Sequence, residues 1–260
     1  CAKRALAWKR SRTKKPLELD LSSIKHIFNA AEPVRSETIK MFQETFEPHG
    51  FNAKAMSPGY GLAEHTVYVC DGGGKVMSVD LESLERDGHV KKGDAEIVSC
   101  GRPPKSSNIK IILVEKQEAS KDFSEIKTSG KVGEIWVSSK SASSSYWNKD
   151  ESINAEKLQA KVPGRRGVYI RTGDLGFFDK SGELYVTGRS KDLIIIRGRN
   201  HAPEDIEYSV QSACKFLRPG CIAAIAAPMH KKASKMSKSD DLNGDTLCVI
   251  AEVRDGVDKG

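Results

Sequence analysis

The chain has 260 residues, of which 38% are hydrophobic and 30% charged, and its formal net charge is +7. This length allows one large or two modest domains with a sizeable core, and the composition is that of a globular protein. No apolar run approaches the roughly 20 residues of a membrane-spanning helix, and no segment resembles a secretory signal. We therefore expect a cytoplasmic protein without stable membrane insertion.

The cysteines and the basic residues do not by themselves indicate a function. The six cysteines are scattered, without the paired spacing of a zinc site or the secretory context of disulfides. A basic cluster lies between Lys3 and Lys15, with Trp8 as its one interleaved aromatic residue. A solvated helix face is the better interpretation of this cluster, and an acidic partner protein is the sharper alternative.

Residues 19–64 show the alternation of a layered α/β domain. A predicted strand at 19–28 runs into Asn29, and Ser36 is placed to cap a helix with a periodic apolar face. A second short strand at 53–57 would deliver the next segment, 60–64, on a turn. A strand, a helix and a strand in this order are typical of parallel α/β structure.

Short strands separated by turns follow, and their spacing predicts an antiparallel, barrel-like region with a short helix at 152–157. The strands are expected at 66–70, 76–79, 96–98, 109–114, 133–137, 167–171 and 183–187. The last part is expected to hold a strand at 193–196, a helix from Pro203, strands at 221–227 and 246–253, and an exposed loop at 230–244. The predicted fold class is α/β: the tail of a layered α/β domain plus a barrel-like region (1–190), then an incomplete small α+β domain (191–260).

Polar residues on tight turns are densest between Arg171 and Glu207. Asp174 offers two acceptor oxygens to a vicinal diol such as a ribose, and Arg189 offers a planar donor fork to hydroxyls or a phosphate. Nearby turn glycines would allow a ligand to approach closely. The alternative is a pair of hairpins with solvated charges. Together, these residues favour a nucleotide site.

This stretch closely resembles the adenylate-forming enzymes, the superfamily of acyl-CoA synthetases, luciferase and peptide-synthetase adenylation domains. The run from Lys191 to His201 is most similar to the fatty acyl-AMP ligases. The other blocks that resemble the family follow in its order: Asn29-Ala30-Ala31-Glu32-Pro33, Tyr60-Gly61-Leu62-Ala63-Glu64, Gly133-Glu134-Ile135-Trp136-Val137 and Tyr146-Trp147. Such ordered agreement is far more specific than any single motif.

The resemblance implies an ATP site. The implied ATP-binding residues are Ala30, Ala31, Glu32, Tyr60, Gly61, Asp174 and Arg189. The first three would lie beside the purine, and the tyrosine would lie against the adenine or the reacting phosphate. The aspartate would accept hydrogen bonds from the ribose, and the arginine would bind the ribose or phosphate side. The structural alternatives are a strand-to-helix turn, a core tyrosine and solvated hairpin charges.

The implied catalytic residues are Glu64, Arg189 and Lys191. Glu64 would be the ligand of Mg²⁺, because a hard oxygen donor on a turn suits that ion; an exposed loop carboxylate is the alternative. Lys191 matches the family's hinge, about which the small domain turns, and a surface lysine is the alternative.

The implied reaction is ATP-dependent activation of a medium- or long-chain fatty acid to fatty acyl-AMP, with release of pyrophosphate. The acyl group would then pass to the phosphopantetheine thiol of an acyl carrier protein. A fatty acyl-CoA synthetase and a non-catalytic binding module on the same fold are the alternatives. A nucleic-acid binder is favoured by charge alone, and we expect no nucleic-acid partner.

Two further expectations concern segments of the family. The connection 71–96 is longer than a hairpin requires and resembles the insertion by which acyl-AMP ligases restrain domain rotation; a tolerated surface loop is the alternative. The family's upstream phosphate loop and its C-terminal catalytic lysine are not found in this sequence. We therefore expect the chain to make no acyl-adenylate alone.

Overall fold

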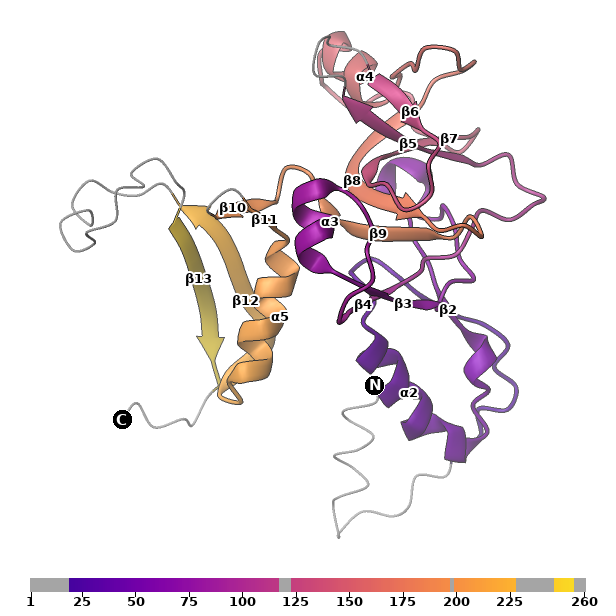
Figure 1. Ribbon diagram of the computed structural model, residues 1–260. Coiled ribbons are helices and arrows are strands. Elements are labelled where there is room, and N and C mark those ends of the chain that lie inside the picture. The colour runs from indigo at the N-terminus through magenta and orange to yellow at the C-terminus, as the bar shows by residue number, and fades with distance from the viewer. Residues whose placement is uncertain (1–18, 117–122, 197–198, 228–245, 255–260) are drawn as a thin grey trace, which may run out of the picture.

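The computed structural model describes residues 19–116, 123–196, 199–227 and 246–254 (Figure 1). It is a mixed α/β structure with antiparallel sheets and few helices. None of the helices in these ranges is long and apolar enough to cross a membrane. The basic cluster before residue 19 and the predicted loop at 230–244 lie outside the described residues.

The N-terminal part is a short β-α-β unit. Strands β1 (Ile27–Asn29) and β2 (Met56–Pro58) are parallel, and α2 (Ser36–Phe46) lies between them in the chain. The helix packs its aromatic face against Phe51. Because the two strands are parallel, the segments that follow them leave the same edge of this small sheet.

Local predictions for this unit were partly wrong. The predicted strand at 19–28 is shorter, and the one at 53–57 divides into the turn η2 (Ala53–Ala55) and β2. Ser36 is the first helical residue rather than the cap, because its hydroxyl donates to Glu96. The 3-10 turn η1 (Glu47–His49) ends the helix at Gly50, which has a φ of 81°.

The central element is a five-stranded antiparallel sheet with the order β6-β5-β7-β8-β9. Its strands are β5 (Lys110–Lys116), β6 (Phe123–Ile126), β7 (Gly133–Ser138), β8 (Ile170–Phe178) and β9 (Leu184–Arg189). Helix α4 (Glu151–Lys157) lies in the connection from β7 to β8. Leu113 and Ile135 belong to one buried cluster and Ile112 and Trp136 to another, so the central strands are covered on both faces.

The segment 71–96, together with the two residues that follow it, folds as a strand, a helix and a returning strand. Strands β3 (Val76–Val79) and β4 (Ala95–Val98) are antiparallel, and α3 (Leu81–Asp87) lies between them in the chain. Asp80 caps α3 by accepting a hydrogen bond from the backbone N–H of Glu82, and the helix ends at Gly88, with a φ of 64°. This helix was not predicted, although both of its end signals are present in the sequence.

The described residues of the C-terminal part form one helix and two antiparallel sheets of two strands each. Its elements are β10 (Ile194–Ile196), β11 (Arg199–His201), α5 (Pro203–Ala213), β12 (Leu217–Ala227) and β13 (Thr246–Val253). Helix α5 packs against β12, and α3 contacts β11, so that α3 lies between this unit and the central sheet (Figure 1). Strands β6 and β11 were not predicted, and 66–70 contributes an isolated bridge from Cys70 to Tyr60 rather than a strand.

Candidate functional site

Three of the predicted site residues, Tyr60, Asp174 and Arg189, lie in direct contact. The Tyr60 hydroxyl donates to Oδ2 of Asp174 at 2.5 Å, and Nε of Arg189 donates to Oδ1 at 2.8 Å. Asp174 and Arg189 are paired across β8 and β9, and Tyr60 comes from the turn that follows β2. The structure thus brings the acid and the guanidinium to one point, as a shared ribose site requires.

Irregular pairing in the sheet directs Asp174 toward this point. The register of β8 shifts against β7 beside Gly173, which has a φ of 75°, and shifts again against β9 at Leu175. Thr172 accepts a hydrogen bond from the backbone N–H of Asp174 and donates its own hydroxyl to the carbonyl of Ile135. Bulges of this kind re-aim a side chain beside functional sites.

The three side chains form a partly buried hydrogen-bonded cluster around the carboxylate of Asp174. The side chain of Asp174 is 11% exposed, whereas that of Arg189 is 58% exposed. The pKa of the Tyr60 hydroxyl is raised, first by burial and then by the charge of Asp174, so Tyr60 acts as a neutral hydrogen-bond donor. The hydrogen bond to Asp174 raises the pKa of Arg189. A carboxylate has about four lone-pair sites, so both oxygens of Asp174 can still accept from a diol.

Glu64 lies on the 3-10 turn η3 (Ala63–His65), which ends in a strained backbone. Thr66 and Val67 have φ values of 56° and 73°, and such a conformation is a genuine outlier for a β-branched residue. Gly61 allows this turn to close, because a Cβ at Gly61 would stand 1.4 Å from the carbonyl oxygen of Val67. The two β-branched residues with a left-handed backbone among the described residues thus both lie in the turn that carries the expected metal ligand.

One oxygen of Glu64 is held by Tyr146, whose hydroxyl donates to Oε1 at 2.8 Å. Burial and this hydrogen bond raise the pKa of Tyr146 to about 12, so the hydroxyl keeps its proton at neutral pH. No cluster of three His, Cys, Asp or Glu side chains able to hold a metal is found among the described residues. A single carboxylate nevertheless suits Mg²⁺, which protein sites often bind through one or two carboxylates together with water and substrate phosphates.

His65, beside Glu64, is 1% exposed and fully hydrogen-bonded. Its Nδ1 lies 2.7 Å from the carbonyl oxygen of Tyr68, and its Nε2 lies 2.5 Å from Oγ of Ser139. A carbonyl can only accept, so Nδ1 carries a proton. Sequence reasoning missed His65 and Ser139, because neither forms a motif with neighbours along the chain.

The segment expected beside the purine leaves β1 at the edge from which the Tyr60 turn leaves β2. Asn29 is paired with Pro58, and its carbonyl accepts from the backbone N–H of Gly59. Ala31 is exposed and has a φ of 80°. The residues Ala30, Ala31 and Glu32 therefore start from the same sheet edge as Tyr60 and Gly61.

Lys191 is not brought into contact with these groups. It is exposed in the turn between β9 and β10, two residues after Arg189. The backbone just before it is fixed, because the N–H of Ser190 donates to the carbonyl of Gly173. This placement, between the central sheet and the C-terminal unit, is compatible with a hinge.

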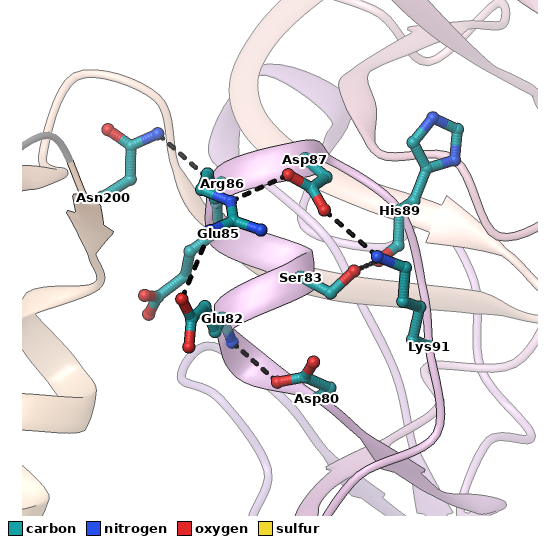
Figure 2. Close-up of polar contacts among 9 residues, drawn as sticks. All are labelled: Asp80, Glu82, Ser83, Glu85, Arg86, Asp87, His89, Lys91 and Asn200. Atoms are coloured by element: carbon teal, nitrogen blue, oxygen red, sulfur yellow. Dashed lines mark hydrogen bonds and ion pairs between the residues drawn. The ribbon is translucent and has the colours of Figure 1, made fainter.

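Helix α3 makes polar contacts with β11 that the sequence did not indicate (Figure 2). Asn200 donates from Nδ2 to the backbone carbonyl of Glu85 at 3.2 Å, and Nδ1 of His201 lies 3.5 Å from Oε2 of the same residue. On the other side of the helix, Asp87 pairs with Arg86 and Lys91. The segment 71–96 is thus a point of contact with the C-terminal unit.

Residues 2–147 match the family model described as AMP-binding enzyme, and the chain belongs to that family.

Among curated relatives, the chain is 34% identical to the long-chain-fatty-acid–AMP ligase FadD32 of Mycolicibacterium smegmatis, over 93% of this chain and 41% of that protein. It is 40% identical to the medium-chain-fatty-acid–[acyl-carrier-protein] ligase JamA of Moorena producens, over 99% and 44%. A fatty acyl-adenylate ligase from L. pneumophila, solved with acyl adenylate and pyrophosphate, superposes with a TM-score of 0.64 at 33% identity, over 99% and 43%. The chain spans less than half the length of these relatives.

Proposed function

We propose that the protein containing this chain activates a medium- or long-chain fatty acid with ATP, forming fatty acyl-AMP and pyrophosphate. The observation that carries the proposal is the convergence of Tyr60, Asp174 and Arg189 on one point. The names of the relatives support the same chemistry, since they include long-chain and medium-chain fatty-acid ligases. The proposed compartment is the cytoplasm.

The reaction brings a fatty-acid carboxylate to the α-phosphate of ATP, so two negative groups must meet. Asp174 would hold the ribose hydroxyls, and the hydroxyl of Tyr60 would keep the carboxylate of Asp174 oriented. The exposed end of Arg189 would attract the phosphates, while its Nε stays bound to Asp174. Mg²⁺, held by Glu64 when bound, would neutralise phosphate charge and orient the leaving group. The backbone of Ala30, Ala31 and Glu32 would lie beside the purine.

For the domain organisation, we propose that residues 1–190 belong to the large domain and 191–260 to the small one, with Lys191 at the hinge. The segment 71–96 would be the ligase-type insertion that restrains domain rotation. Its contact with β11 supports this, because β11 belongs to the small domain, which would rotate about the hinge. The acyl acceptor would then be an acyl carrier protein, as the name of JamA states for that relative. Coenzyme A is the second candidate, since acyl-CoA synthetases share the superfamily that the motifs resemble.

The complete protein, incubated with ATP, Mg²⁺ and a fatty acid of about twelve carbons, tests this proposal. We expect fatty acyl-AMP by mass spectrometry with an equal amount of pyrophosphate, and loss of the acyl-AMP when holo-carrier protein is added. Conversion by coenzyme A instead of the carrier would favour the second candidate. A folded protein that binds ATP but yields no acyl-AMP across chain lengths would favour the non-catalytic module.

A further inference from the structure

We propose that Tyr146 is a positioning residue for Glu64, and that the loop 139–147 braces the turn that presents this carboxylate to the metal. The inference rests on the proposed function, because it concerns the same Mg²⁺-nucleotide site. It assigns a role to a tyrosine that approaches the site from a distant part of the chain.

The first support is the number of consecutive residues that this one loop holds. The backbone N–H of Ser143 donates to the carbonyl of Glu64 at 2.8 Å, and the hydroxyl of Thr66 donates to the carbonyl of Ser141 at 3.2 Å. Between them, His65 contacts Ser139 at 2.5 Å. Three residues in a row are therefore tied to the segment that follows β7.

The second support is the strained backbone of the same turn. Left-handed conformations at Thr66 and Val67 persist only where the surroundings over-determine them. The turn's own hydrogen bond, from the N–H of Val67 to the carbonyl of Leu62, accounts for part of this. The contacts from the loop hold the same residues from outside the turn, so the loop and the turn form one unit.

The third support is the way in which Tyr146 is itself fixed. Its backbone N–H donates to Oδ1 of Asn154 at 2.7 Å, and Asn154 is a buried residue of α4. Tyr146 therefore links α4 to Glu64. Its hydroxyl occupies Oε1 of Glu64, and within the described residues Oε2 has no hydrogen-bond partner. The bond thus fixes the carboxylate while leaving an oxygen for a cation.

The test compares the complete enzyme with its Tyr146→Phe variant, which removes one hydroxyl. Binding of Mn²⁺ in the presence of ATP, followed by electron paramagnetic resonance, gives a readout that does not depend on turnover. We expect the variant to bind Mn²⁺ about tenfold more weakly, as the loss of one hydrogen bond to a charged group allows. The Mg²⁺ concentration for half-maximal pyrophosphate release should rise, while the rate at saturating Mg²⁺ should change far less.

Tyr208→Phe is the matched control, because Tyr208 makes its contact with Arg35 through the ring, which phenylalanine retains. It should leave cation binding and activity unchanged. Thermal melting of all variants reports on folding. Repeating the substitution in a Glu64→Gln background tests whether Tyr146 acts on cation binding through the carboxylate of Glu64. In that background, Tyr146→Phe should cause no further loss of cation affinity.

Unchanged Mn²⁺ affinity in Tyr146→Phe, or an equal additional loss in the Glu64→Gln background, would overturn the positioning role while leaving the proposed function intact. A wild-type enzyme that binds no Mn²⁺ with ATP and releases no pyrophosphate would overturn the proposed function, and this inference with it.

Discussion

Asp174 is a nearly buried carboxylate whose cost of desolvation is met by two donors, one neutral and one cationic. Removing either donor would leave part of the charge uncompensated, which is more costly than the loss of an exposed ion pair. The arrangement orients both oxygens before any ligand arrives. Because the side chain of Asp174 is already ordered, binding of a ribose would cost less conformational entropy.

At the same scale, Gly61 is required for a steric reason and Gly88 for a conformational one. Gly61→Ala would place a methyl group against the carbonyl oxygen of Val67, whereas a Cβ at Gly88 meets nothing within 4 Å. We expect Gly61→Ala to lower the free energy of unfolding by on the order of 3 kcal/mol and to abolish acyl-AMP formation.

Gly88→Ala is the matched comparison, and the penalty of its left-handed backbone should be about 1 kcal/mol with activity retained. Urea unfolding of both variants measures the difference. Equal losses of stability would contradict the steric account of Gly61.

At the scale of elements, the turn between β8 and β9 is organised by Asp179. Its side chain is 5% exposed and accepts from the backbone N–H groups of Ser181 and Glu183, while Oδ2 pairs with Lys75, the residue before β3. Burial opposes ionisation, but the hydrogen bonds from Lys75 and Ser181 prevail and hold the pKa of Asp179 well below its usual range. One carboxylate thus closes the hairpin and joins it to the segment 71–96.

This element should make the stability of the protein sensitive to acid. The folded pKa of Asp179 is depressed, so its contribution is fully present above the unfolded value of about 3.9 and is lost as the pH falls through the folded value. We expect Asp179→Asn to lower the free energy of unfolding by about 1–2 kcal/mol at neutral pH, because hydrogen bonds to the carboxylate are lost.

Urea unfolding of the wild type and Asp179→Asn over a series of pH values measures this difference. The difference in free energy of unfolding between the two proteins should become smaller in acid. If this difference in free energy of unfolding stayed constant with pH, the charge of Asp179 would not be the source of the stabilisation.

Over the whole molecule, the parts that the sequence predicted are those governed by local signals. Apolar runs such as Ile109 to Val114 indicated β5, β7 and β9, and the ordered motifs indicated the family. Strand β8 begins three residues after the start of the predicted strand 167–171 and continues to Phe178, because its irregular pairing hides the alternation of apolar residues. The bond between Tyr146 and Glu64 was not predictable, because the two residues are 82 positions apart and meet through the packing of a loop.

The same reasoning explains the missed helix and the corrected cap. Asp80 and Gly88 mark the ends of α3, but the helix is so short that its apolar period is weak, and Leu84 is buried by residues of the distant β8 and β9. Ser36 has the chemistry of a cap, yet a tertiary partner, Glu96, takes its hydroxyl. Tertiary contacts overrode the local preference there.

The measurement that tests the central claim most directly compares ATP with 2′,3′-dideoxy-ATP as ligands of the complete enzyme, in the wild type and in Asp174→Asn. Calorimetric titration gives the ratio of the two affinities for each protein. If Asp174 holds the ribose, the wild type should prefer ATP by about tenfold or more, and the variant should bind both nucleotides almost equally. The same preference in both proteins would show that the ribose is recognised elsewhere.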